Sequence, residues 1–201
     1  MAGRGRPRGF DRDAVLLRAM RVFWENGYEA TSVADLTSAM GINSPSLYSA
    51  FGSKEALFRE AVEIYSATEG SGWRRALDEE PTARAAVEAM LRTNAVAFTT
   101  PGRPSGCMIV LAATNCSEDN AGVRDLLAGY RSRVHASVRE RIERGVTEGD
   151  VPGDADAGAL ASFYDTVHNG LSLRARDGAS CSELLGVVDS AMAAWGALTA
   201  R

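Results

Sequence analysis

Residues 31–58, TSVADLTSAMGINSPSLYSAFGSKEALF, constrain the fold more than any other stretch of the chain. They predict two short helices joined by a tight turn, followed at once by the start of a third. Asp35 lies three residues after Ser32, which is the spacing of a capping box. Each predicted helix starts at a polar N-cap and the first two end at glycine: the caps are Ser32, Asn43 or Ser44, and Ser53, and the glycines are Gly41 and Gly52.

Each of the first two helices carries one apolar face. Leu36 and Met40 share a face of the first helix, and Leu47 and Phe51 share a face of the second. Helices this short are not stable alone, so they need to pack as a three-helix unit. Such a unit presents one helix outward, as helix-turn-helix proteins do when they enter the major groove of DNA.

The first third of the chain resembles the tetracycline-repressor (TetR) family of bacterial regulators. The matching positions fall in one register without a gap, and they are Phe23, Gly27-Tyr28, Thr31-Ser32, Leu36, Met40-Gly41-Ile42, Ser46-Leu47-Tyr48, Phe51 and Lys54–Phe58. The resemblance implies a dimeric DNA-binding regulator, most often a repressor, whose C-terminal domain binds a small-molecule effector. The remaining two thirds fit the family in length and helical character.

Charge is distributed unevenly along the chain. The whole chain has a net charge of −4, whereas residues 1–60 carry eight Lys and Arg against seven Asp and Glu, a net of +1. The predicted recognition helix has no Lys, Arg or Gln between Asn43 and Ala50. We therefore expect much of the affinity to come from phosphate contacts rather than from base readout.

The predicted DNA contacts combine a basic arm with hydroxyl and amide groups of the head. Asn43 and small apolar groups could read base edges, and the resemblance implies that Tyr48 and Lys54 hold the DNA backbone. The set is Arg4, Arg6, Arg8, Thr31, Ser32, Asn43, Ser44, Pro45, Ser46, Tyr48, Ser49 and Lys54.

The periodicity predicts an all-α fold with about nine helices. We expect a basic arm over residues 1–10, a DNA-binding head over 11–53, and a helical effector-binding and dimerisation domain over 54–201. Outside the motif the predicted helices are 11–26, 54–77, 83–99, 107–115, 118–149, 154–176 and 182–199.

The last two helices carry apolar stripes that pack either inside the protomer or against a second copy. The resemblance implies dimerisation through a four-helix bundle, with Phe163, Val167, Leu171, Leu184, Val188, Met192 and Trp195 as the candidates. A two-fold dimer places two recognition helices on one face of DNA and requires a palindromic operator.

Candidates for an effector cavity are the aromatic, polar and sulfur-containing side chains of the helices between. They are Trp73, Phe98, Cys107, Met108, Asn115, His135, Phe163, Tyr164 and His168, each of which could also be an ordinary core residue.

Other functional classes find little support. There is no nucleophile elbow, phosphate-binding loop or dinucleotide fingerprint, so we expect no enzyme and no cofactor. Three cysteines without a Cys-x-x-Cys pair argue against disulfides and a metal site. The longest apolar run, 107–113, is too short to span a membrane, so we expect a cytoplasmic protein. The alternative is a helical small-molecule-binding or thiol redox-sensing protein (through Cys107 or Cys116) with a vestigial DNA-binding head.

Overall fold

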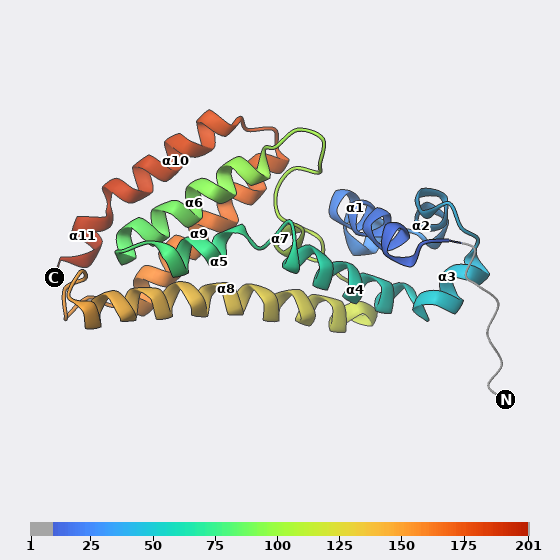
Figure 1. The fold of residues 1–201 in the computed structure, drawn as a ribbon, viewed down its shortest axis with the longest axis horizontal. Coiled ribbons are helices and arrows are strands. Elements are labelled where there is room, and N and C mark those ends of the chain that lie inside the picture. The colour runs from blue at the N-terminus through green and yellow to red at the C-terminus, as the bar shows by residue number, and fades with distance from the viewer. Residues whose placement is uncertain (1–9, 201) are drawn as a thin grey trace.

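The computed structural model describes residues 10–200, which form helices and no β-strand (Figure 1). Within these residues nine helices have eight or more residues, which confirms the predicted all-α fold. A 3₁₀ turn, Glu118–Asn120, precedes α8. The helices are α1 (Arg12–Ala30), α2 (Val33–Met40), α3 (Ser44–Phe51), α4 (Lys54–Ala67), α5 (Gly72–Glu79), α6 (Ala83–Phe98), α7 (Met108–Leu111), α8 (Ala121–Glu148), α9 (Ala157–Arg176), α10 (Cys181–Ala193) and α11 (Trp195–Thr199).

The helices form a small head and a longer body. Helices α1, α2 and α3 gather at one end of the molecule, and α4 leads from α3 into the body (Figure 1). Helices α5, α6, α8, α9 and α10 make up the body, with α8 running along one side of it. The α3 helix therefore lies at one end of the molecule, and the C-terminal residues lie at the other.

The predicted helix starts in the head are confirmed. The Ser32 hydroxyl accepts from the amide of Asp35 at 3.1 Å, and the Asp35 carboxylate accepts from the amide of Ser32 at 2.8 Å. Asn43 and Ser53 each cap their helix by accepting from the amide three residues later. Gly41 has a φ of 69°, in the left-handed region that the turn between α2 and α3 requires.

Aromatic side chains join α1 to α4. The Phe58 ring packs edge-on against Phe23 and Tyr28, with both centroid distances at 5.0 Å. About two turns further along α4, Trp24 packs edge-on against Tyr65, with a centroid distance of 4.9 Å. All five side chains are buried, so the head and the body share one apolar core.

The helix predicted over 54–77 is wrong: it is two helices, α4 and α5, with a turn between them. The amide of Gly70 donates to the carbonyl of Tyr65 at 2.8 Å and so ends α4. A Cβ atom on Gly70 would lie 2.7 Å from Cε1 of Tyr65, so this turn depends on glycine. The break lets α5 fold back against α6.

Several predicted boundaries also differ in the C-terminal part. Of the helix predicted over 107–115, only the four residues of α7 are helical. The predicted helix over 182–199 is interrupted at Ala194, where α10 ends and α11 begins. Helix α8 starts at Ala121, after the 3₁₀ turn, and α9 starts at Ala157 rather than at Asp154.

The end of α1 is kinked at Gly27. The sequence predicts a stop at this glycine, whereas helical structure resumes after it and continues to Ala30. Gly27 has φ 77° and ψ 173°, a conformation that is almost exclusive to glycine. A Cβ atom there would lie 3.1 Å from the carbonyl oxygen of Ala112, so the body packs directly on this backbone.

Among residues 10–200, no helix combines the length and the apolar character that crossing a bilayer requires.

We expect Gly27→Ala to lower the free energy of unfolding by about 1–3 kcal/mol, because alanine does not tolerate this backbone conformation. Gly129→Ala is the matched control, since Gly129 lies inside α8 and a Cβ atom added there would have nothing within 4 Å. Urea denaturation followed by circular dichroism measures both variants. A Gly27→Ala protein as stable as the Gly129→Ala protein would contradict the strain argument.

Candidate nucleic-acid interface and ligand cavity

One face of helix α3 packs against its neighbouring helices, and the opposite face is exposed to solvent. Leu47 and Phe51 are buried against the other head helices, which fixes the orientation of α3. The opposite face is exposed and includes the Tyr48 side chain, which is 48% exposed. The exposed residues Asn43, Ser44, Pro45, Tyr48 and Ser49 therefore lie together at the end of the molecule, with the half-buried Ser46 beside them.

Two predicted phosphate contacts are placed differently from the prediction. Thr31 is fully buried and its hydroxyl donates to the carbonyl of Gly27 at 2.6 Å, so its side chain does not reach the surface. The Ser32 hydroxyl is exposed but donates to the Asp35 carboxylate at 2.6 Å. Hydrogen bonds from Ser32 lower the pKa of Asp35. This carboxylate therefore occupies the positive end of α2, which makes that end less favourable for a phosphate.

Lys54 lies beside α1 in the first turn of α4. Its Nζ is 4.3 Å from the centroid of the Tyr28 ring, an arrangement that suits a cation–π contact. Burial lowers the pKa of Lys54, and the nearby Glu29 carboxylate opposes that shift. The ammonium is held at the junction of head and body rather than extended freely into solvent.

Arg12 of α1 connects to α3 and to α4, a role that sequence reasoning missed. Its guanidinium pairs with Glu60 of α4 at 2.7 Å and stacks 4.5 Å from the centroid of the Phe51 ring of α3. No local pattern marks this contact, because its partners lie 39 and 48 residues away in the sequence. Arg4, Arg6 and Arg8 lie outside the described residues.

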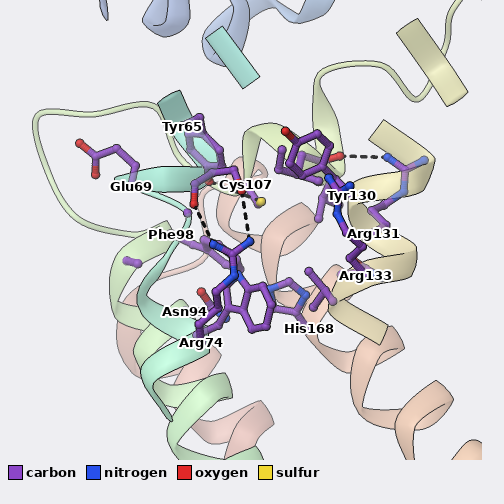
Figure 2. Close-up of a pocket in the computed structure, with 18 of the residues that line it drawn as sticks. Tyr65, Glu69, Arg74, Asn94, Phe98, Cys107, Tyr130, Arg131, Arg133 and His168 are labelled. Carbon is purple, nitrogen blue, oxygen red and sulfur yellow. Dashed lines mark hydrogen bonds between the residues drawn. The ribbon is translucent and has the colours of Figure 1, made fainter. Parts of the chain in front are cut away.

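The body contains a cavity walled by α4, α5, α6, α8, α9 and the segment around α7 (Figure 2). Its aromatic walls include Tyr65, Trp73, Phe98 and Tyr130. Arginine side chains from α5 and α8 also line it.

Only some of the predicted ligand-contacting residues line the cavity. Trp73, Phe98, Cys107 and His168 line it. The other five candidates do not, and they are Met108, Asn115, His135, Phe163 and Tyr164.

Each of the excluded residues has a structural reason for its place. Met108 is buried in the core, and the Tyr164 hydroxyl donates to the carbonyl of Ala191 at 3.2 Å. Asn115 is exposed in the segment after α7, and His135 lies 3.1 Å from the Ser162 hydroxyl near the surface.

Sequence reasoning also missed cavity residues, notably Tyr65 and Asn94. Tyr65 lies on the buried face of α4, where an aromatic side chain is typical of the core, and Asn94 lies in the middle of an apolar helix. A buried asparagine inside an apolar face is the one signal that could have drawn attention to the cavity, because buried amides need partners.

Burial governs the protonation of the two reactive groups in the cavity. Burial raises the pKa of the Cys107 thiol, and the Tyr65 hydroxyl lies 3.4 Å from its sulfur. Burial lowers the pKa of His168 to about 4, so this imidazole is uncharged at neutral pH. In the described part of the chain no group of three or more His, Cys, Asp or Glu side chains is arranged to hold a metal ion.

Head and body are joined by two groups of contacts, one on each side of the Gly27 kink. Arg176 of α9 makes the group that precedes the kink. Its Nη1 and Nη2 donate to the carbonyls of Glu25 and Trp24 at 2.6 and 2.7 Å, and its Nε donates to Ser105 at 3.0 Å. The Trp24 indole donates to the carbonyl of Gly106 at 3.0 Å. A single guanidinium therefore ties the last regular turn of α1 to the segment before α7.

The second group of contacts between head and body follows the Gly27 kink and involves Tyr28 and Glu29. The amide of Tyr28 donates to the carbonyl of Ala112 at 2.7 Å. The Glu29 carboxylate accepts from the amide and hydroxyl of Ser117, both at 2.6 Å, and from Asn120 at 2.9 Å. These bonds lower the pKa of Glu29 to about 2. We call the contacts of residues 24–29 with Arg176 and residues 105–120 the head–body seam.

The outer surface of α9 and α10 agrees only in part with the predicted dimer residues. Five of the seven predicted dimer residues are buried inside the protomer, and they are Leu171, Leu184, Val188, Met192 and Trp195. The other two predicted residues, Phe163 and Val167, are exposed and half-buried, and Leu173 and Val187, which were not predicted, are exposed as well. The strongest apolar stripe fills the protomer core, so it is not available to a second copy.

Comparison with known proteins agrees with this architecture. Residues 15–61 match the family model described as "Bacterial regulatory proteins, tetR family", and residues 81–180 match a "Tetracyclin repressor-like, C-terminal domain". The chain belongs to the TetR family. It is 33% identical to the HTH-type transcriptional repressor ComR of Escherichia coli K12, over 96% of this chain and 92% of that protein. It is 34% identical to the repressor BdcR of the same strain, over 90% and 86%.

Solved structures of TetR-family regulators have the same fold. A cysteine mutant of the TetR family regulator CifR, complexed with 26-base-pair operator DNA, is 48% identical and superposes with a TM-score of 0.92. That alignment covers 95% of this chain and 100% of the CifR chain. A TetR regulator from Rhodococcus sp. RHA1 is 37% identical over 94% and 99%, with a TM-score of 0.60.

We expect Cys107 to react more slowly than Cys116 and Cys181 with a thiol reagent such as DTNB at pH 8. Its side chain is buried, whereas the other two are half-buried, so the reagent reaches it least easily. Burial raises the pKa of both the Cys107 and the Cys116 thiol, which disfavours the reactive thiolate in each, so the difference in access decides the order. Stopped-flow absorbance should resolve one slow thiol, and Cys107→Ser should remove that slow phase. A slow phase that persists in Cys107→Ser would contradict the assignment.

We expect Glu29→Gln to lower the melting temperature at pH 7 and to lose this effect in acid. The folded-state pKa of Glu29 is depressed from 4.5 to about 2, so its stabilisation is present above pH 4.5 and is lost as the pH falls toward 2. The difference from wild type should therefore shrink across that range. Asn115→Ala, exposed in the same segment, is the control. A difference that is constant with pH would refute the role of the Glu29 charge.

Proposed function

We propose that the protein is a transcriptional repressor that binds a palindromic operator as a homodimer and leaves it when a small molecule occupies the body cavity. The observation that carries this proposal is α3, a helix anchored by Leu47 and Phe51 whose opposite face is exposed at the end of the head. The complex of CifR with operator DNA supports the same role for this chain, given 48% identity along nearly its whole length.

The exposed face of α3 has few groups that read bases. The Asn43 carbonyl oxygen caps the helix, which leaves its amide nitrogen to donate to a base edge. Ser44, Pro45, Ser46 and Ser49 supply small hydroxyl and apolar groups around it. With no arginine in α3 to pair with guanine, most of the affinity comes from phosphate contacts by Tyr48, Lys54 and the arginines of the N-terminal arm.

Dimerisation uses the outer face of α9 and α10. Phe163, Leu173 and Val187 are 38%, 53% and 45% exposed, and a second copy would cover them. A two-fold axis through this face places the two α3 helices on the same side of the DNA. Their spacing then matches successive major grooves, about 34–36 Å apart, or a longer multiple.

We infer that release from DNA depends on residues 106–112, which belong both to the cavity wall and to the head–body seam. Cys107, Ile109 and Val110 line the cavity, while Gly106 and Ala112 in the same segment bond to α1. A ligand that displaces this wall moves the end of α1 and so rotates the head. It favours release only if it binds the rotated state more tightly than the DNA-bound state.

We propose binding rather than catalysis, and a cytoplasmic location where DNA is accessible. The buried, protonated Cys107 thiol favours ligand binding over thiol redox sensing as the trigger, because the thiolate is the reactive form.

The test is a gel shift against the DNA upstream of the coding region. We expect Tyr48→Phe to weaken binding by about 0.5–1.5 kcal/mol per half-site, because it removes one hydrogen bond. Lys54→Met removes the ammonium, and with it the cation–π contact with Tyr28, and should lower the salt slope by about 1 per half-site. Each variant should lose the same binding free energy on every operator sequence, because phosphate contacts do not depend on the bases.

Base-reading variants should behave differently. Asn43→Ser keeps the helix cap, and together with Ser46→Ala it should change sequence preference rather than the salt slope. Arg75→Met, an exposed cation on α5, is the control and should bind as wild type does. Failure of the wild-type protein to bind any duplex at low salt would overturn the proposal, as would a strictly monomeric protein.

A further inference from the structure

We infer that the body cavity selects an uncharged aromatic or alicyclic ligand that presents a hydroxyl group to Asn94 and His168. This deepens the proposed effector role of the cavity and rests on that proposal for its regulatory meaning. The ligand assignment itself is argued from the residues that line the cavity and does not depend on the regulatory role.

Asn94 and His168 line the cavity from two different helices, α6 and α9 (Figure 2). Their side chains are only 7% and 5% exposed. Among the described residues, neither Asn94 Nδ2 nor His168 Nδ1 has a hydrogen-bond partner. Phe98, one helical turn after Asn94, holds its ring 5.6 Å from the His168 ring. The two polar atoms therefore belong to one apolar-walled cavity.

These unpartnered atoms are costly unless a ligand uses them. A buried polar group without a partner destabilises a protein by about 1–3 kcal/mol. The other buried atoms without a partner belong to charged groups that are bonded through another atom. Arg141 donates to the Glu80 carbonyl, Asp150 accepts from the Ala83 amide, and Arg103, which also lines the cavity, pairs with Glu69. Asn94 and His168 line the cavity, and none of the described residues forms a hydrogen bond with these two atoms.

The end of the cavity near these two residues suits a neutral group. Burial keeps His168 uncharged at neutral pH, so neither residue supplies a positive charge for a carboxylate. The charged residues of the lining have their own partners. Glu69 pairs with Arg103, Arg131 donates to the carbonyl of Ile109, and Asp165 accepts from Asn169. Burying an ion beside Asn94 and His168 would therefore be unfavourable.

The two remaining arginines of the lining lie against aromatic rings. The Arg74 guanidinium carbon is 4.9 Å from the centroid of the Trp73 ring, and that of Arg133 is 4.0 Å from the Tyr130 ring. Arg74 also donates to the carbonyl and the hydroxyl of Ser66, both at 3.5 Å, so both guanidinium groups already have contacts within the protein.

A hydroxyl satisfies both polar atoms, whichever nitrogen of His168 carries the proton. It accepts from the Asn94 amide, and it either donates to Nδ1 or accepts from Nδ1–H. A carbonyl or an ether can serve only one of these tautomers. The rest of the ligand meets Tyr65, Trp73, Phe98 and Val134, whose rings and methyl groups favour a flat apolar body.

The test compares three matched probes by isothermal titration calorimetry: 4-methylphenol, its methyl ether 4-methylanisole, and 4-methylbenzoate. We expect wild-type protein to bind 4-methylphenol at least tenfold more tightly than either of the others. Asn94→Leu and His168→Leu should each reduce this preference to less than threefold. Asn115→Ala and His135→Ala lie outside the cavity and should keep it.

The melting temperature shows whether a variant that loses the preference for 4-methylphenol is still folded. Because the Asn94 amide nitrogen has no partner, Asn94→Leu should have a melting temperature equal to or above that of wild type. A lower melting temperature for Asn94→Leu contradicts the inference. So does failure of 4-methylphenol to bind, equal binding of the three probes, or a preference that survives in both variants.

The gel shift separates this inference from the proposed function. Both cavity variants should bind operator as wild type does without probe, and 4-methylphenol should release only the wild-type and control proteins. A protein that prefers 4-methylphenol but never binds the operator overturns the proposed function and leaves the ligand assignment intact. A protein that binds the operator but shows no preference for the hydroxyl overturns the ligand assignment alone.

Discussion

The packing of the kinked end of α1 against the body is the constraint on which the rest of this structure depends. Gly27 adopts a backbone conformation that brings the chain against the carbonyl of Ala112, and Arg176 bonds the carbonyls just before the kink. Aromatic contacts of Phe23 and Tyr28 with Phe58 then fix α1 on α4. Without these contacts, α2 and α3 would have no defined orientation relative to the body.

The same contacts give the cavity a physical route to the head. The chain between α6 and α8 forms part of the cavity wall and also accepts or donates the hydrogen bonds that hold α1. Because packed interiors do not deform continuously, we expect a displacement of this wall to move the head as a unit. In the proposed function, this segment is the route by which a ligand among α6, α8 and α9 acts on a helix at the far end of the molecule.

Polar groups in the head serve structure first and recognition second. The Ser32 and Asp35 side chains satisfy each other, Thr31 bonds inside α1, and Asn43 uses its oxygen as a cap. The groups left for DNA are few and mostly uncharged. Binding that relies on phosphates in this way is expected to be strongly salt-dependent, and its selectivity depends on the geometry of the dimer as much as on α3.

Most of the head could be predicted because its signals are local. Cap residues, turn glycines and apolar pairs four residues apart act within one or two helical turns, and the structure confirms them at Ser32, Gly41, Asn43 and Ser53. The same local reasoning misplaced the end of α4, because the turn at Gly70 depends on contact with the Tyr65 ring.

The cavity and the outer face were decided by tertiary structure. Periodicity shows that α9 has apolar residues on more than one side, but it does not show which side meets α6 and which meets solvent. Packing turned His168 and Leu171 inward and left Phe163 outside. The sequence by itself determined that a helix-turn-helix head forms and where its helices start, because those interactions are short in range. Only the packing of distant helices decided which buried side chains share a cavity.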